Sequence, residues 1–157
     1  MTKKIYYTND EISDMLKEVI RQIVADGYQP DCVVGLSRGG LDIGIKMSHF
    51  FGVPFEPLKW QTRNGNFQDR ANLDRIMTQY HRVLIIDDIL DSGLSLNEID
   101  RSIGDPLHGE HRFAVLIQNI AAEDAPDPHY SAVEINKVET PAWIVFPWEN
   151  WWCPSLR

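Results

Sequence analysis

The sequence predicts an α/β fold in which a central, mostly parallel sheet is flanked by helices. Short apolar segments of strand length alternate along the chain with segments whose apolar residues recur at helical spacing. Strands joined through helices run parallel, and a parallel sheet needs cover on both faces. With 157 residues, 43% hydrophobic and 24% charged, the chain is expected to form a single domain over residues 1–157.

The first predicted element is a helix that begins after Thr8. Thr8 and Glu11 have the spacing of a capping box, in which each side chain satisfies a free backbone N–H group. Gly27 and Pro30 then end the helical pattern. The apolar residues at helical spacing are Ile12, Met15, Leu16, Val19, Ile23 and Val24.

The next predicted elements are a strand, a helix and a second strand. Residues 32–36, CVVGL, are a short apolar strand, and the glycines of residues 37–40, SRGG, interrupt it before a helix over 41–52. Residues 53–60 form a strand that contains prolines and is therefore expected near a sheet edge. The polar segment Gln61–Arg75 has no clear period, and we interpret it as a long mobile loop with a helical turn at its end.

The remaining elements are four strands and one helix. Residues 82–87, RVLIID, are the clearest strand of the chain, and a short helix over 94–104 follows them. Three further strands are predicted over 112–119, 130–136 and 142–146. We expect the ends of the chain to form a small hood beside the sheet.

Composition excludes several classes of function. The formal net charge is −8 and no run of Lys and Arg appears, which argues against binding to nucleic acid. No apolar segment has the length of a membrane span, so we expect a cytoplasmic protein without a membrane partner. Cys32 and Cys153 have no metal-ligand spacing and are expected to be reduced thiols, and the five histidines show no ligand spacing either.

The segment VLIIDDILDSGLS, Val83–Ser95, concentrates the candidate chemistry. Asp87 and Asp88 follow an apolar strand directly, and Asp91 comes just before a Ser-Gly turn. Like charges this close raise one another's pKa unless a cation offsets them. Asp87 and Asp88 are therefore candidates to hold a divalent metal such as Mg²⁺, or sugar hydroxyls.

Two loops of this sequence have the composition of phosphate-binding sites. Residues 92–95, SGLS, would form a turn into a helix N-terminus, whose free N–H groups and partial positive charge favour an anion. Arg38 and the paired glycines of residues 37–40 offer a planar set of donors and a close backbone approach. Ligands of open parallel sheets bind where strands end in such loops.

These residues carry a resemblance to a known family. VLIIDDILDSGLS resembles the phosphoribosyl pyrophosphate (PRPP) signature of the type I phosphoribosyltransferases, which have a Rossmann-like fold. VVGLSRGGL, Val33–Leu41, resembles the pyrophosphate-binding loop of the same family, especially its bacterial xanthine-guanine branch. The segment Gln61–Arg75 takes the place of that family's flexible catalytic loop.

The resemblance implies a role for each residue of the PRPP signature. Asp87 and Asp88 would bind the ribose hydroxyls of PRPP, directly or through Mg²⁺. Asp91 would lie near the base as the catalytic proton acceptor. The 5'-phosphate would be bound by Ser92, Gly93, Leu94 and Ser95.

The pyrophosphate and base ends follow from the same resemblance. Ser37, Arg38 and Gly39 would contact the pyrophosphate, and in this family the peptide bond that corresponds to Ser37–Arg38 is often cis. Trp143 is expected to stack on the base, and Ile144 to offer backbone contacts. The related branch has a lysine that recognises the purine 6-oxo group. Asn119 occupies that position here and is expected to contact the base with an amide hydrogen bond in place of a charge.

The resemblance implies an enzyme that transfers 5-phosphoribosyl from PRPP to a nucleobase, expected to be guanine, xanthine or hypoxanthine, in nucleotide salvage. Relatives are homodimers or homotetramers, and the C-terminal tryptophans Trp148, Trp151 and Trp152 are expected to serve packing or subunit contact. The alternatives are a non-catalytic PRPP or nucleotide sensor and, less well supported, a response-regulator receiver. Charged residues of the loop region, such as Lys59, Arg63 and Arg70, are expected to be solvated.

Overall fold

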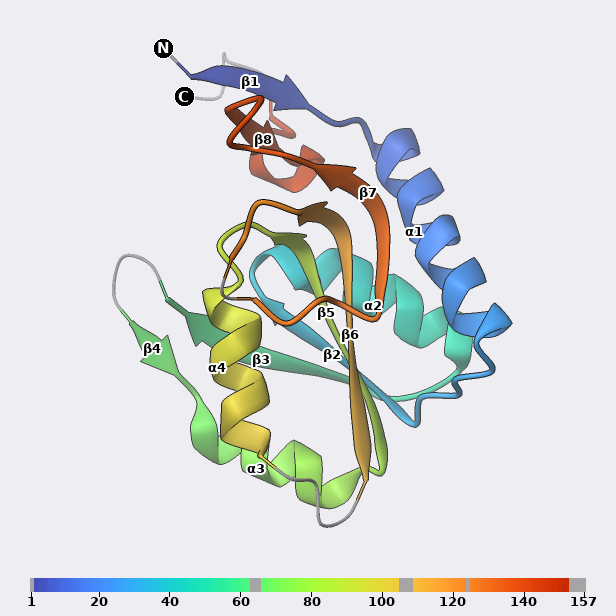
Figure 1. Ribbon diagram of the computed structural model, residues 1–157. Helices are drawn as coiled ribbons and strands as arrows, with labels where there is room; N and C mark the ends of the chain where they lie inside the picture. The colour runs from blue at the N-terminus through green and yellow to red at the C-terminus, as the bar shows by residue number, and fades with distance from the viewer. Residues whose placement is uncertain (1, 63–65, 105–108, 124, 153–157) are drawn as a thin grey trace.

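A computed structural model describes residues 2–62, 66–104, 109–123 and 125–152 of the chain, and its main feature is a six-stranded sheet (Figure 1). The strand order is β4-β3-β2-β5-β6-β7, with β4 antiparallel to β3 and the other neighbours parallel. The predicted mostly parallel sheet is thereby confirmed. The strands are β2 (Cys32–Ser37), β3 (Phe55–Gln61), β4 (Phe67–Gln68), β5 (Arg82–Leu90), β6 (Glu110–Asn119) and β7 (Tyr130–Ile135).

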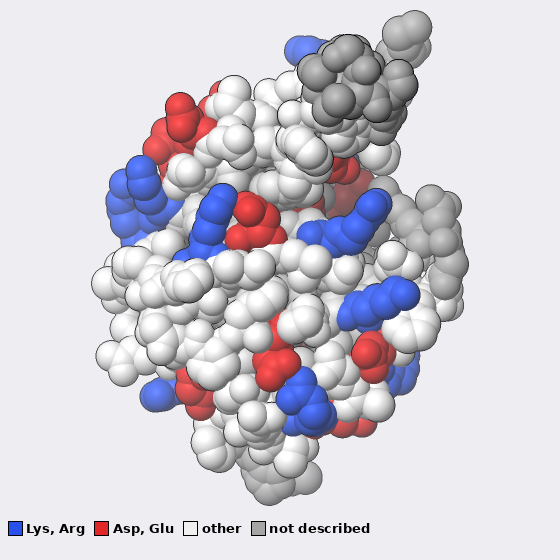
Figure 2. Space-filling view, turned by 180° about the vertical axis from the view of Figure 1, so that it is seen from behind, with Lys and Arg blue, Asp and Glu red and all other residues white. Residues whose placement is uncertain are grey.

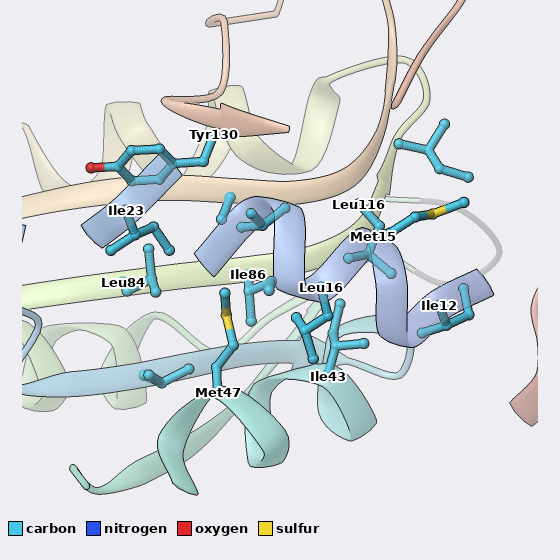
Figure 3. Close-up of a cluster of buried hydrophobic side chains, with 14 of the residues drawn as sticks. Ile12, Met15, Leu16, Ile23, Ile43, Met47, Leu84, Ile86, Leu116 and Tyr130 are labelled. Carbon is cyan, nitrogen blue, oxygen red and sulfur yellow. The ribbon is translucent and has the colours of Figure 1, made fainter. Parts of the chain in front are cut away.

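Four helices cover the two faces of this sheet. Two clusters of buried hydrophobic residues pack the helices against the sheet. Successive residues of β5 face opposite sides of the sheet, so Leu84 and Ile86 belong to the first cluster and Val83 and Ile85 to the second. The first cluster joins α1 and α2 to one face (Figure 3), and the second joins α3 and α4 to the opposite face. The helices are α1 (Asn9–Ala25), α2 (Gly39–Phe51), α3 (Arg70–Gln79) and α4 (Leu94–Ile103).

The predicted helix ends have the expected local chemistry. The backbone N–H of Thr8 donates to Glu11 Oε2 at 2.7 Å, and the N–H of Glu11 donates to Thr8 Oγ1 at 3.2 Å, so the capping box of α1 is confirmed. Helix α2 ends at Gly52, whose φ of 65° lies in the left-handed region that glycine adopts at low cost.

The prediction of a loop over Gln61–Arg75 was wrong for much of its length. Strand β3 extends to Gln61, the short strand β4 pairs back with it, and α3 begins at Arg70. The buried side chains of α3 are Leu73 and Ile76, so its apolar period crosses the end of the predicted loop. The loop positions 63–65, including Arg63, lie outside the described residues.

A second, two-stranded sheet forms the expected hood. Strand β1 (Lys3–Tyr6) pairs in parallel with β8 (Ala142–Val145), and Figure 1 shows this pair beside the main sheet. The strand at 142–146 was predicted, whereas β1 was not. Among the helices that the structure describes, none has both the length and the hydropathy of a membrane span.

Charged side chains of both signs are interspersed on one face of the molecule. On the face seen in Figure 2, blue Lys and Arg side chains alternate with red Asp and Glu side chains. No basic stripe crosses the described residues of this face, in keeping with the formal net charge of −8.

Candidate active site

A cavity of about 910 Å³ lies where β2 and β5 end and the hood begins. The two phosphate-type loops, the three aspartates and the hood all contribute to its walls, as expected for an open parallel sheet. Ser37 and Asn119 are the predicted site residues that do not line it. The predicted residues that do are Arg38, Gly39, Asp87, Asp88, Asp91, Ser92, Gly93, Leu94, Ser95, Trp143 and Ile144.

The acidic pair belongs to the last part of β5, which continues to Leu90, beyond the predicted strand. The backbone N–H of Asp88 donates to Asp87 Oδ1 at 3.0 Å. Burial raises the pKa of the Asp87 carboxyl well above its usual range, and the charge of Asp88 raises it further. Burial also raises the pKa of Asp88 to about 6, and the charge of Glu149 adds to this. A bound cation would relieve both effects.

The loop after Asp91 leads into α4 through Gly93, whose φ is 78°. Gly93 precedes the first helical residue and has no side chain to cap the helix, and the N–H of Leu94 makes only a long contact of 3.5 Å with Ser92 Oγ. This helix start therefore suits an anion. Ser95 lies in this first turn, and its Oγ is 3.2 Å from Thr62 Oγ1. Thr62 also lines the cavity and was not singled out from the sequence.

The loop between β2 and α2 lies against the acidic pair. The peptide bond between Ser37 and Arg38 is cis, as the resemblance implied. Arg38 and Gly39 face the cavity, and a methyl group at Gly39 would overlap the carboxyl of Asp88. Glycine at this position therefore allows the two loops to approach each other.

A lysine that the sequence analysis missed lies beside Asp91. Lys137 follows β7, and its Nζ is 2.9 Å from Asp91 Oδ1, with 18% of the lysine side chain and 26% of the aspartate side chain exposed. Both residues line the cavity. A single lysine after a predicted strand carries no sequence signal of its own, which is why only the structure identifies it.

Asn119 does not have the position that the sequence analysis gave it. It is 8% exposed and lies outside the cavity lining, where its Nδ2 donates to the carbonyl oxygen of Asp91 at 2.9 Å. Its amide thus bonds to the backbone beside the cavity, and the cationic side chain next to the Asp91 carboxylate is that of Lys137. Direct contact between Asn119 and a base is not supported by this geometry.

The hood closes the other side of the cavity with aromatic rings. Trp143, on β8, lines the cavity with 51% of its surface exposed, which leaves a ring available for stacking. Trp148 stacks on Phe146 with ring centroids 4.9 Å apart, and both rings line the cavity. Trp152 also lines it, whereas Trp151, 76% exposed, does not. Trp148 and Trp152 therefore have a place at the cavity in addition to the packing role that was predicted.

The charged residues of the β3–β4 region lie outside the cavity lining. Lys59 Nζ is 4.6 Å from the centre of the Phe67 ring. Arg70 donates to Ser102 Oγ at 2.6 Å and lies over the Trp60 ring. Both residues are exposed, as predicted, and their contacts are with neighbouring side chains.

The donor set fits a divalent cation that shares its ligands with a substrate. Among the described residues, no group of three or more His, Cys, Asp or Glu side chains could hold a metal alone. Asp87 and Asp88 provide carboxylate oxygens, the ligands that Mg²⁺ prefers, and Mg²⁺ commonly takes its other ligands from water and phosphates.

Comparison with known proteins gives one family and several relatives. A family model described as the phosphoribosyl transferase domain matches residues 3–150. The chain is 28% identical to a xanthine-guanine phosphoribosyltransferase from Cereibacter sphaeroides over 135 residues, which covers 79% of this chain and 75% of the relative.

Two solved structures share the fold. A hypothetical protein from Neisseria gonorrhoeae with bound ppGpp superposes with a TM-score of 0.75 at 20% identity, over 95% of this chain and 90% of the other. A purine phosphoribosyltransferase from Pyrococcus horikoshii superposes with a TM-score of 0.72 at 23% identity, over 94% and 95%. At sequence identities of 20% and 23%, these two likenesses show a shared fold and nothing about function.

Proposed function

We propose that this protein transfers phosphoribosyl from PRPP to a purine base. The chain belongs to the type I phosphoribosyltransferase family and is a phosphoribosyl-transferring enzyme, and the proposal names its donor and its acceptor. The observation that most supports this is the content of one cavity. It combines two loops suited to phosphates, an acidic pair suited to a ribose and a cation, and the exposed ring of Trp143. Salvage of free purine bases in the cytoplasm, by a homodimer or homotetramer, completes the proposal.

The proposed reaction exchanges one bond at the anomeric carbon. The bond from this carbon to the pyrophosphate oxygen breaks, and its electron pair leaves with pyrophosphate. A ring nitrogen of the base supplies the electron pair of the new carbon–nitrogen bond, and the proton that the base must lose moves to Asp91. General base help of this kind contributes roughly 10²–10⁴-fold to a rate.

Each end of PRPP has a matching group in the cavity. Ser92, Gly93, Leu94 and Ser95 would bind the 5'-phosphate. Arg38 and Gly39 would contact the pyrophosphate, and Ser37 precedes them outside the cavity lining. Asp87 and Asp88 would hold the ribose hydroxyls and Mg²⁺. When bound, Mg²⁺ would offset the negative charge on the departing pyrophosphate.

The pair formed by Asp91 and Lys137 supports a 6-oxopurine as the base. The Asp91 carboxylate accepts hydrogen bonds and the Lys137 ammonium group donates them, and Lys137 Nζ lies 2.9 Å from Asp91 Oδ1. Guanine, xanthine and hypoxanthine carry an exocyclic oxygen beside the imidazole ring, which accepts from Lys137. Adenine carries an amino group there, which meets the ammonium donor to donor.

A second function, the PRPP or nucleotide sensor of the same fold, draws support from the Neisseria gonorrhoeae structure with bound ppGpp. Asp91 and Lys137 favour the enzyme, because a sensor has no need of a proton acceptor at the base. The two functions differ in one measurable property: the enzyme releases pyrophosphate from PRPP when a base is present, whereas the sensor only binds its ligand.

The test is pyrophosphate release from PRPP and Mg²⁺ with guanine, xanthine, hypoxanthine, adenine, uracil or orotate. We expect release with the three 6-oxopurines and a loss of at least 100-fold in Asp91→Asn. PRPP binding without release for any base would contradict the proposal and support the sensor.

A further inference from the structure

Asn119 is the last residue of β6 and one of two buried polar residues, with Ser48, in the described part of the chain. A buried amide is costly unless its hydrogen bonds are made. The bonds of Asn119 all go to backbone groups, and these groups belong to three different segments at the edge of the cavity.

The amide nitrogen and the amide oxygen of Asn119 point to different partners. Nδ2 donates to the carbonyl oxygen of Asp91 at 2.9 Å. Oδ1 accepts from the N–H of Lys137 at 3.1 Å and from the N–H of Ala121 at 3.3 Å. One side chain thus ties together the loop after β5, the end of β6 and the turn after β7.

These contacts form a closed ring with the ion pair in the cavity. Asp91 and Lys137 are joined at their main chains through Asn119, and at their side chains through the 2.9 Å ion pair. Asn136 supports the same turn, because its Oδ1 accepts from the N–H groups of Val138 and Glu139. Asn119 therefore fixes the backbone from which each charged side chain starts.

We infer that Asn119 is a positioning residue that sets Asp91 and Lys137 side by side for the base, without touching the base itself. The inference rests on the proposed function, in which these two side chains meet one edge of a 6-oxopurine. Displacement of reacting groups by about 1 Å can cost on the order of 100-fold in rate, so a buried amide that holds both groups has a large effect on turnover.

Two variants test the inference. Asn119→Asp keeps an acceptor for Lys137 and Ala121, but it loses the donor to Asp91 and sets a carboxylate oxygen against that carbonyl. Asn119→Leu removes all three bonds at similar volume. The matched control is Gln118→Leu on the same strand, because the Gln118 amide bonds to Asp127 and Ser131, outside the cavity lining.

Steady-state kinetics should separate the base from PRPP. We expect kcat/KM for guanine to fall about 10-fold in Asn119→Asp and more in Asn119→Leu, while KM for PRPP stays within about threefold of the wild type. Should Asn119→Leu fail to fold, Asn119→Asp decides. Wild-type values for guanine, or an equal loss of PRPP affinity, would overturn the inference.

A double-mutant cycle tests whether Asn119 acts through Lys137. In a Lys137→Met background, Asn119→Leu should cost less in kcat/KM for guanine than it costs in the wild type, because one of the two groups that Asn119 positions is gone. Losses that simply multiply would show that Asn119 acts independently of Lys137, and the inference would be wrong.

A measurement without turnover separates this inference from the proposed function. The ammonium signal of Lys137 in a nitrogen-15 NMR spectrum, identified by its loss in Lys137→Met, should be visible in the unliganded wild type and broadened in Asn119→Asp. A wild type that shows this signal but releases no pyrophosphate would refute the proposed function alone. An unchanged signal in Asn119→Asp would refute the positioning role alone.

Discussion

Lys137 Nζ lies 2.9 Å from Asp91 Oδ1, and the two residues follow strands separated by β6. Their charges offset each other inside the cavity. Asp87 and Asp88, earlier on β5, lie against the loop that carries Arg38 and Gly39, and burial raises the pKa values of both carboxyls. The cavity therefore contains one ion pair and two carboxyls whose charged form a bound cation would favour.

Lys137→Met should weaken recognition of the base and leave PRPP recognition intact. A hydrogen bond from a charged donor contributes about 1.5–3 kcal/mol, so kcat/KM for guanine should fall roughly 10- to 100-fold. Steady-state kinetics with guanine and PRPP varied separately would measure this. Lys59→Met is the control, since Lys59 lies over Phe67 outside the cavity lining, and an equal loss in that variant would contradict the assignment.

Asp88→Asn should stabilise the unliganded protein at pH 7.5. The pKa of Asp88 is raised by burial to about 6, so between about pH 4 and 6 the folded state binds more protons than the unfolded state. The free energy of unfolding consequently falls as pH rises through this window. Removing the charge should raise Tm by about 3–6 °C, equivalent to about 1–2 kcal/mol.

The same variant should lose the stabilisation that Mg²⁺ and PRPP give together. Thermal unfolding of both proteins at pH 4.5 and 7.5, with and without these ligands, checks both effects. If the Tm of Asp88→Asn without ligands at pH 7.5 lies below that of the wild type, the buried charge of Asp88 does not destabilise the fold, and the prediction is wrong.

Gly39→Ala should impair PRPP binding, because the added methyl group would displace the Asp88 carboxyl. We expect KM for PRPP to rise about 10-fold or more. Gly52→Ala, at the other end of α2, is the matched control: its φ of 65° makes alanine strained, but nothing lies within 4 Å of the added atom. The control should lose about 1 kcal/mol of stability and keep KM for PRPP.

Trp143→Leu should raise KM for the base. Stacking of a base on an aromatic ring contributes about 1–3 kcal/mol, which corresponds to roughly 5- to 160-fold. Trp151→Leu removes an equally large ring that is more exposed and outside the cavity lining, so its KM for guanine should match the wild type. Equal effects in the two variants would argue against Trp143 as the stacking surface.

The part of the cavity lining that Val83–Ser95 contributes could be predicted because its determinants are contiguous. An apolar strand, acidic residues, a Ser-Gly turn and a helix start occur within Val83–Ser95, and local rules connect them to one loop. The alternation of strands and helices likewise indicated the main sheet, because each element is long enough to show its own period.

The rest depended on contacts between distant segments. Strand β1 is four residues long with three of them exposed, and it forms through pairing with β8 rather than through any pattern of its own. Lys137 is brought to Asp91 by the order of β5, β6 and β7 and by the turn after β7. The family resemblance put Asn119 at the base, whereas in the structure its side chain bonds to backbone groups of Asp91 and Lys137.

The parallel pairing of β1 with β8 has a consequence for biosynthesis. As a nascent chain leaves the ribosome, Lys3–Tyr6 emerges early and must wait for Ala142–Val145 before the two strands can pair. Closing so long a loop makes this contact one of the slowest to form. A nascent chain can therefore form the loops after β2 and β5 well before the ring of Trp143 is in place, so the hood side of the cavity is completed last.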